Sequence, residues 1–196
     1  MIPIDTLRAV RRCIVHANCP DGRASAVLIH QAIPSVEVVE IAYNSPEHLT
    51  LPAWTGLLFC DFTPHRSRVQ EFVDAGAIVL DHHRGAEDVV RAFGPLGVFA
   101  DETRDPGVSG AVLALREVLD PIKGPRPPFV GDARWRHAET FARLVGIRDT
   151  WQRHDPNWQR ACEVSNVIRM LSLDACLQRG PGRILSLADD IGADLW

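Results

Sequence analysis

The feature of this sequence that most constrains its fold is a series of short runs that are apolar at every position, such as Ala77-Ile-Val-Leu80. Each run alternates with a segment whose apolar residues recur at helical spacing. A strand that is apolar on both faces must be covered on both faces, which is typical of parallel sheets between helices. We therefore predict an α/β protein with a mostly parallel five-stranded sheet flanked by helices and a helical C-terminal part. The expected strands are residues 13–16, 36–42, 56–60, 77–80 and 96–99, and the expected helices are residues 22–33, 64–75, 109–119, 135–145, 156–171 and 182–195.

A proline-rich segment divides the chain. Residues 121–129 contain four prolines and a glycine, a composition that does not continue a regular helix. We interpret residues 121–131 as a linker between an α/β domain, residues 1–120, and a helical part, residues 132–196, that completes this domain.

The composition limits the classes of function. Hydrophobic residues make up 46% and charged residues 23%, as in an ordinary globular protein. The net charge of −4 provides no basic field for a long nucleic-acid duplex. No apolar run approaches the ~20 residues that span a bilayer, and the N-terminal segment lacks the apolar core of a signal peptide. We expect a cytoplasmic protein without a membrane partner, whose five cysteines are reduced and mostly buried.

Potential metal ligands follow three of the expected strands. They are His16 and Asp21 after the first strand, Asp61 after the third, and Asp81, His82 and His83 at the fourth. In a parallel sheet the carboxyl ends of the strands border one crevice, where ligands bind. Carboxylates and imidazoles suit hard divalent cations, and a shared carboxylate can bridge two ions about 3.5–4 Å apart. The pattern predicts a two-metal hydrolytic site.

The motifs resemble those of the DHH phosphoesterase superfamily in type and order. They are His16-Ala-Asn-Cys-Pro-Asp-Gly22, Asp61 after an apolar strand, Asp81-His-His83, Ser109-Gly-Ala111 and Gly146-Ile-Arg-Asp149. The resemblance covers roughly residues 12–155. The superfamily includes manganese pyrophosphatases, single-strand exonucleases and hydrolases of short oligonucleotides and cyclic nucleotides. The Cys-Pro-Asp-Gly version resembles a branch with oligoribonuclease-like and nucleotide phosphodiesterase-like members.

The resemblance implies roles for individual residues and two divalent ions, taken as Mn²⁺. His16 and Asp61 would hold one ion, and Asp21, Asp61, His82 and Asp149 the other, so that Asp61 bridges. Asp81 would orient a histidine, and His83 would face the substrate phosphate or the leaving group. The residues expected to bind substrate are Ser109, Gly110, Arg84 and Arg148.

The sequence departs from the family pattern in two places. Cys19 stands where the first aspartate of the first motif is expected, one residue closer to His16. It is either a soft ligand that favours zinc or iron, or a spectator beside a water. In addition, the segment after Leu119 lacks the glycine-rich motif with a histidine that grips substrate in family members. The chain is then a minimal form, a fragment, or a protein that borrows a partner subunit to close its site. A homo-oligomer is a separate expectation.

Several residues also have ordinary structural interpretations. Asp61 could cap a helix, Asp149 could be a helix-terminal carboxylate, and Ser109-Gly110 could allow close helix–sheet packing. Arg84, Arg148 and Arg153 could be solvated, and Trp151 and Trp158 could belong to the core instead of stacking on bases. His48, His65, His137 and His154 are interpreted as surface residues.

These patterns predict a metal-dependent phosphohydrolase that cleaves short oligonucleotides or small nucleotides. The alternatives are an inorganic pyrophosphatase and a weakly catalytic module that senses a nucleotide.

Overall fold

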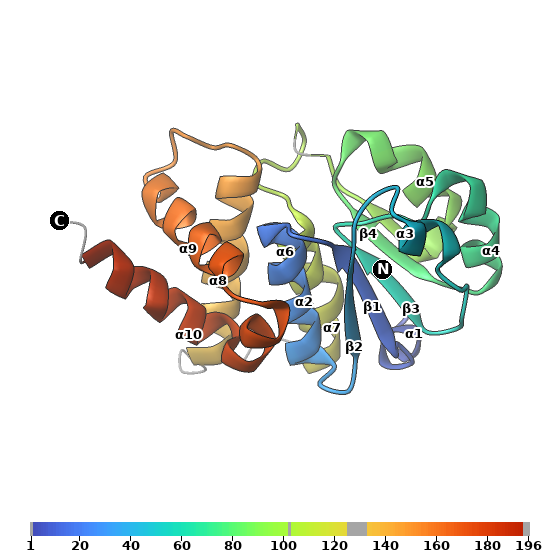
Figure 1. Ribbon diagram of the computed structural model, residues 1–196, viewed down its shortest axis with the longest axis horizontal. Coiled ribbons are helices and arrows are strands. Elements are labelled where there is room, and N and C mark those ends of the chain that lie inside the picture. Colours follow the sequence, from blue (N-terminus) through green and yellow to red (C-terminus); the bar gives the residue numbers. More distant parts are fainter. Residues whose placement is uncertain (1, 102, 125–132, 194–196) are drawn as a thin grey trace.

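The computed structural model describes residues 2–101, 103–124 and 133–193. Its centre is a sheet of five strands in which every neighbouring pair is parallel (Figure 1). The strands are β1 (Arg12–His16), β2 (Glu37–Ile41), β3 (Leu57–Cys60), β4 (Ile78–Asp81) and β5 (Gly97–Phe99). Their order is β2-β1-β3-β4-β5. The predicted α/β class and five-stranded sheet are confirmed.

Helices cover both faces of the sheet and form a further layer beyond one of them. They are α1 (Ile4–Arg8), α2 (Pro20–Ala32), α3 (Pro46–Thr50), α4 (Val69–Asp74), α5 (Glu87–Ala92), α6 (Gly110–Ala114), α7 (Asp120–Lys123), α8 (Ala133–Asp149), α9 (Trp158–Met170) and α10 (Leu173–Ala193). α2 and α6 pack on one face of the sheet, and α5 packs on the other beside α4. α8, α9 and α10 pack against α2, so that α2 lies between the sheet and the C-terminal helices (Figure 1).

The composition of α2 explains its central position. Its buried residues lie all around the helix and include Gly22, Ala24, Ser25, Ala26 and Leu28. Small side chains let a helix approach neighbours on every side, and a helix that is apolar all round belongs in the interior. The buried residues of α2, of one face of the sheet and of the C-terminal helices form one hydrophobic cluster, with Leu28, Leu58 and Phe141 among its members.

Several element boundaries differ from the predicted ones. The predicted helix 64–75 is the 3₁₀ turn η1 (Arg66–Arg68) followed by α4, because the His65 side chain accepts a hydrogen bond from the Ser67 amide and starts the turn there. The helix predicted to end at residue 119 continues through the π-helical segment η4 (Leu115–Leu119) into α7, with Pro121 near the start of α7. The segment interpreted as a linker therefore begins inside a helix, and residues 125–132 lie outside the described residues.

The C-terminal helices differ in length from the predicted ones: α8 is longer, whereas α9 is shorter than the predicted residues 156–171. α8 reaches Asp149. α10 begins at Leu173 and is interrupted at Gly180, whose backbone is not helical (φ 65°, ψ 176°), ahead of Pro181, so that the predicted helix from residue 182 corresponds to its second part. Residues 194 and 195 of that prediction lie outside the described residues. None of the helices in the described ranges is both long and apolar enough to cross a membrane.

Candidate metal centre

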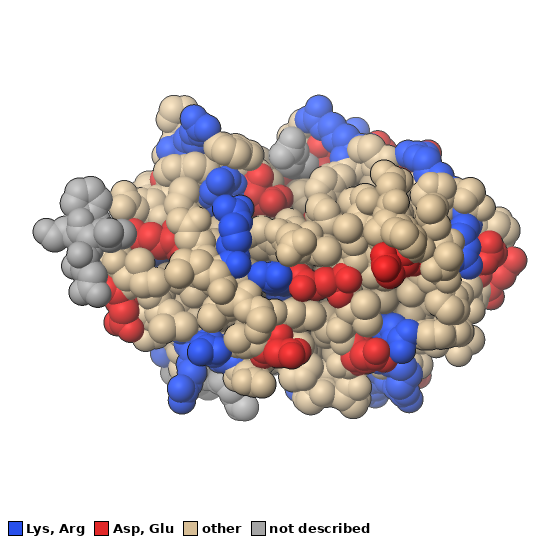
Figure 2. Space-filling view, in the orientation of Figure 1, with Lys and Arg blue, Asp and Glu red and all other residues tan. Residues whose placement is uncertain are grey.

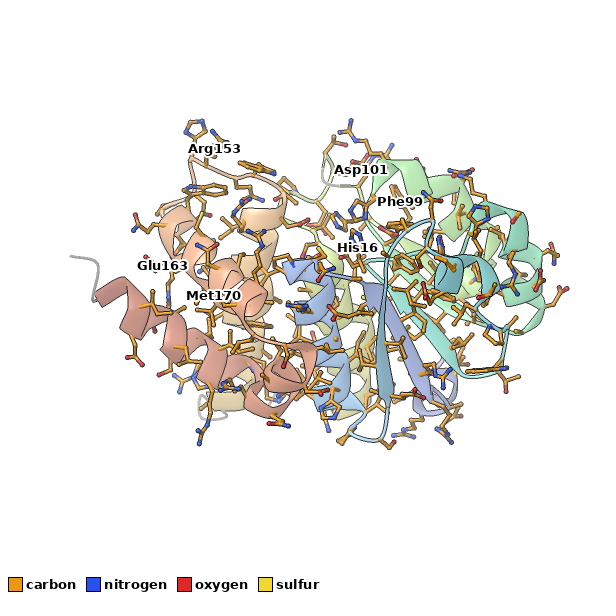
Figure 3. The ribbon with its side chains drawn as sticks, viewed as in Figure 1. His16, Phe99, Asp101, Arg153, Glu163 and Met170 are labelled. Atoms are coloured by element: carbon orange, nitrogen blue, oxygen red, sulfur yellow. The ribbon has the colours of Figure 1, made fainter. Side chains whose placement is uncertain are left out.

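The strand order places the predicted ligands at one position on the carboxyl edge of the sheet. β2 lies on one side of β1 and the remaining strands on the other, so the connections diverge between β1 and β3. His16 is the last residue of β1, and Asp61 directly follows β3. Asp81 is the last residue of β4, the next strand along. Figure 3 shows His16 in the middle of the molecule, where the sheet meets the helical part. A crevice at such a switch point is the usual ligand site of a parallel sheet.

The first motif forms a tight turn from β1 into α2. Asn18 has left-handed backbone geometry (φ 57°), and Cys19 is the extended residue that precedes the helix. Pro20 opens the helix, where its missing N–H costs no hydrogen bond. Asp21 then lies in the first helical turn and is 1% exposed. The turn thereby places His16, Cys19 and Asp21 on one side of the sheet edge.

Asp21 is held by the start of α6. The Ser109 hydroxyl donates to Asp21 Oδ1 at 2.8 Å, and the amides of Gly110 and Ala111 donate to Oδ2 and Oδ1 at 2.6 and 2.9 Å. Ser109 and Gly110 are buried. Their donors are used by a neighbouring carboxylate, and the substrate-binding role expected of them stays a prediction.

Gly110 permits this close approach. A Cβ atom at this position would lie 2.5 Å from Asp61 Cβ and 2.8 Å from Ser25 Oγ. Both distances are shorter than real Cβ contacts allow. Glycine is therefore required where α6 meets the two carboxylates.

Three carboxylates surround one nitrogen of His82. Its Nε2 lies 3.3 Å from Asp61 Oδ1, 3.5 Å from Asp21 Oδ2 and 3.5 Å from Asp149 Oδ2. Asp149 comes from the C-terminal end of α8, far away in sequence. Burial alone would lower the pKa of His82, but its hydrogen bonds and charge interactions with Asp21 and Asp61 raise it to about 11. Burial and the negative charge of Asp21 raise the pKa of Asp149 to about 6.

Asp61 is fully buried, and only one of its two carboxylate oxygens has a hydrogen-bond partner. It has left-handed backbone geometry (φ 56°), and its amide donates to the Leu80 carbonyl, which keeps it in register with β4. Oδ1 faces His82, whereas Oδ2 has no hydrogen-bond partner. Burial, together with the charge of Asp21, raises the pKa of Asp61 well above its usual range. Buried polar atoms normally have partners, so this oxygen is a candidate metal ligand.

Asp81 holds the backbone of His82 and His83, and the ring of His83, by hydrogen bonds. Its Oδ1 accepts hydrogen bonds from the amides of His82 and His83 and from His83 Nδ1, at 2.7, 2.9 and 2.7 Å. Asp81 is fully buried, and its Oδ2 has no partner. The bond to Nδ1 raises the pKa of His83, whose side chain is 47% exposed. The other ring nitrogen of His83, Nε2, is not bonded to Asp81.

Besides the group formed by Asp21, His82 and Asp149, Asp61 belongs to another group of potential metal ligands. It consists of His16, Cys19 and Asp61, whose ligand atoms lie within 4.8 Å of one another. Burial, followed by the charge of His83, lowers the pKa of His16, which keeps the imidazole neutral and available as a ligand. Burial and the charges of Asp61 and Asp21 raise the pKa of the Cys19 thiol. A bound cation reverses this preference, because a coordinating thiol loses its proton.

Two cavities of about 340 Å³ each flank these ligands. One is lined by His16, Cys19, Arg148, Asp149, Trp151 and Arg169. The other lies beside His83 and is lined by Tyr43, His48, His65 and Ala86 among others. Figure 2 shows basic side chains on both sides of the hollow at the upper edge of the molecule, and Figure 3 places Arg153 and Asp101 on opposite sides of it.

Of the two arginines predicted to bind substrate, Arg148 is among the residues that line these two cavities and Arg84 is not. Arg148 lines the first cavity, and its guanidinium lies 4.4 Å from the centre of the Trp151 ring. Arg84 is exposed beside His83, and its Nε lies 3.9 Å from Asp101 Oδ1. Trp151 is 56% exposed with left-handed backbone geometry (φ 55°), so it is not a core residue.

The sequence reasoning missed the contribution of the segment after β2. Tyr43 and His48 line the second cavity, and His48 is buried instead of lying at the surface. Its Nδ1 accepts from the Asn44 amide, so Nε2 carries the proton and donates to the Thr63 carbonyl at 2.9 Å. The rule that carboxyl ends of parallel strands border one crevice would have marked this segment. Arg169, at the end of α9, carried no comparable signal.

In comparisons with known proteins, no family model, curated protein or solved structure matches this chain.

Proposed function

We propose that this protein is a metal-dependent phosphohydrolase of the DHH type, acting on short oligonucleotides or small nucleotides. The observation that carries the proposal is the convergence of Asp21, Asp61 and Asp149 on one nitrogen of His82. Three buried or half-buried carboxylates this close together repel one another unless a cation lies between them. In the protein without metal, the proton on His82 supplies that positive charge.

The donors fit a pair of divalent ions. Asp21, His82 and Asp149 form one group of potential ligands, and His16, Cys19 and Asp61 form a second. Asp61 lies between them, since Oδ1 faces His82 and Oδ2 is free to bind on the other side. When bound, such a pair provides an activated water and positive charge at the phosphoryl oxygens. Mn²⁺ is the ion proposed for the oxygen-rich group.

His83 is the proposed general acid. Asp81 fixes the ring through Nδ1 and favours its protonated form, so Nε2 can give a proton to the leaving oxygen. Its position beside the second cavity fits this role, because a leaving nucleoside there would place its oxygen near the ring.

The first cavity has the character of a nucleotide site. Arg148 and Arg169 offer charge to phosphate, and the exposed Trp151 ring offers a surface on which a base can stack. Such an aromatic surface favours a nucleotide over inorganic pyrophosphate. The net charge of −4 and the size of the cavities favour a short substrate over a long duplex.

The test is hydrolysis of a fluorescent dinucleotide and of a chromogenic phosphodiester, after chelator treatment and re-addition of Mn²⁺. Wild type is compared with Asp61→Ala, His82→Ala and the control Asp74→Ala, which changes an exposed aspartate on α4. We expect Mn²⁺ to restore activity in wild type and the control only. A folded, metal-bound wild type that hydrolyses neither substrate, but binds a nucleotide, would support the sensor instead. Release of phosphate from pyrophosphate alone would support the pyrophosphatase.

A further inference from the structure

The two ends of the proposed metal centre offer different kinds of donor. Asp21, His82 and Asp149 present only oxygen and imidazole nitrogen. At the other end, Cys19 adds a sulfur atom to the donors of His16 and Asp61. Sulfur is softer than carboxylate oxygen and favours Zn²⁺, Fe²⁺ and Co²⁺ over Mn²⁺ and Mg²⁺. The two ends are therefore not equivalent toward metal ions.

The backbone holds the Cys19 side chain firmly at this end. Asn18 takes left-handed geometry on one side, and Pro20 opens α2 on the other. Cys19 itself is extended (φ −101°, ψ 126°). Cys19 is half-buried and lines the same cavity as His16 and Asp149.

An observation independent of the cysteine points to a ligand at the same place. Asp61 is 0% exposed, and its Oδ2 has no hydrogen-bond partner. Oδ1 faces His82, whereas Oδ2 lies on the side of Gly22, 3.3 Å from the position where a Cβ would stand. That same Cβ position lies 2.6 Å from the carbonyl oxygen of His16. The orphan oxygen is thus directed toward the turn that carries His16 and Cys19.

We propose that Cys19 is a metal ligand and that the His16–Cys19–Asp61 group selects a thiophilic divalent cation of the Zn²⁺, Co²⁺ and Fe²⁺ class. The Asp21–His82–Asp149 group takes a hard cation, so the centre holds two different metals. The inference rests on the metal centre of the proposed function and is independent of the reaction that the centre performs. A thiolate here carries the same charge as the carboxylate expected by resemblance, but with different metal selectivity.

The experiment uses the full chain, freed of metal and titrated with Co²⁺. Wild type is compared with Cys19→Ser, Cys19→Asp and the control Cys162→Ser, which removes a half-buried thiol on α9. We expect a near-ultraviolet thiolate-to-cobalt charge-transfer band in wild type and the control, and its loss in Cys19→Ser. In metal competition, Cys19→Asp should lower the preference for Zn²⁺ over Mn²⁺ by about tenfold or more. Circular dichroism establishes that each variant is folded.

The outcomes separate this inference from the proposed function. Cobalt binding without a charge-transfer band in wild type would show an oxygen and nitrogen site and would overturn the role of Cys19 alone. Absence of cobalt binding to any folded form would overturn both the ligand role and the metal centre. A band that persists in Cys19→Ser would assign it to another thiol and overturn the inference.

Discussion

Nε2 of His82 lies 3.3 Å from Oδ1 of Asp61, and both side chains are buried. In the metal-free protein this contact joins a protonated imidazole to a carboxylate whose second oxygen has no partner. A divalent ion would replace the proton and satisfy that oxygen. Stability, metal affinity and pH dependence should therefore be linked at this pair.

Metal binding should stabilise the fold, and the stabilisation should depend on Asp61. At a metal concentration 100-fold above Kd, the gain is about 2.7 kcal/mol, or about 5–10 °C in Tm for a chain of this size. Asp61→Asn should abolish the gain but leave Tm in chelator equal or higher, because burial and the charge of Asp21 already disfavour the charged form of this carboxylate. Thermal unfolding with and without Mn²⁺ measures both effects. An equal gain in Asp61→Asn would contradict the bridging role, and the exposed Asp74→Asn is the control.

The metal-free protein should lose stability as pH rises above neutrality. The pKa of His82 is raised to about 11 in the fold, so its contribution is complete below the unfolded value of about 6.5 and is lost as pH approaches 11. The raised pKa of Asp61 acts in the same direction. The slope can reach about 1.4 kcal/mol per pH unit for one proton. Urea unfolding in chelator between pH 7 and pH 9, at spacings of about one unit, should show the decline in wild type and in the exposed-site control His154→Gln. A flat profile in wild type, or an unchanged slope in His82→Gln, would contradict this assignment.

Asp81→Asn should impair turnover through His83. The amide no longer stabilises the imidazolium, so the pKa of His83 falls and the alkaline limb of the kcat profile moves to lower pH. General acid catalysis contributes about 10²–10⁴-fold, and we expect a loss of kcat near the lower value. KM and Mn²⁺ affinity should change little. Steady-state kinetics over pH test this, with Asp88→Asn, an exposed aspartate of α5, as the control. A uniform loss without a shifted limb would indicate a merely structural role.

Trp151→Ala should weaken substrate binding without damage to the fold. The ring is 56% exposed beside Arg148, and stacking of one base contributes about 1–3 kcal/mol. KM for a dinucleotide should rise by about 5–150-fold, whereas kcat for the chromogenic phosphodiester should be nearly unchanged. Trp54→Ala is a matched control, since Trp54 is also exposed and packs on a guanidinium, that of Arg12. Equal effects of the two substitutions would remove Trp151 from the binding site.

Gly110→Ala should destabilise the protein and disturb the metal centre together. The new methyl group would lie 2.5 Å from Asp61 Cβ and 3.0 Å from Asp21 Oδ2. Insertion of a carbon into a packed interior costs about 1–3 kcal/mol. Chemical denaturation and Mn²⁺ titration measure the two effects. Gly85→Ala is the control because nothing lies within 4 Å of its Cβ position, and similar behaviour of the two variants would contradict the tight approach of α6.

The sequence predicts the sheet well because each strand is a short local run, and the central strands β3 and β4 are apolar or buried at every position. It predicts the short helices poorly. α1, α3 and α5 have five or six residues each, too few for a helical period to stand out. The first part of α10, residues 173–179, is also short, and the non-helical Gly180 ahead of Pro181 ends it, as glycine and proline together normally do.

The candidate site likewise has residues that the sequence pattern predicts and residues that it does not. His16, Asp61 and Asp81 follow strands, so the topology of a parallel sheet is sufficient to bring them together. The use of Ser109 and Gly110 to hold Asp21 depends on the docking of α6, which no local pattern encodes. The exposed position of Trp151 depends on the loop after α8 and was equally inaccessible to sequence reasoning.

The position of Asp149 at the end of α8 has a consequence for the order of events during synthesis. All the other carboxylates of the site lie within the first 81 residues, on the sheet edge or at the start of α2. A nascent chain therefore presents an incomplete set of ligands until the C-terminal helices have been made and have packed against α2. A chain interrupted before the end of α8 would lack Asp149, one of the proposed ligands, whatever the state of its sheet.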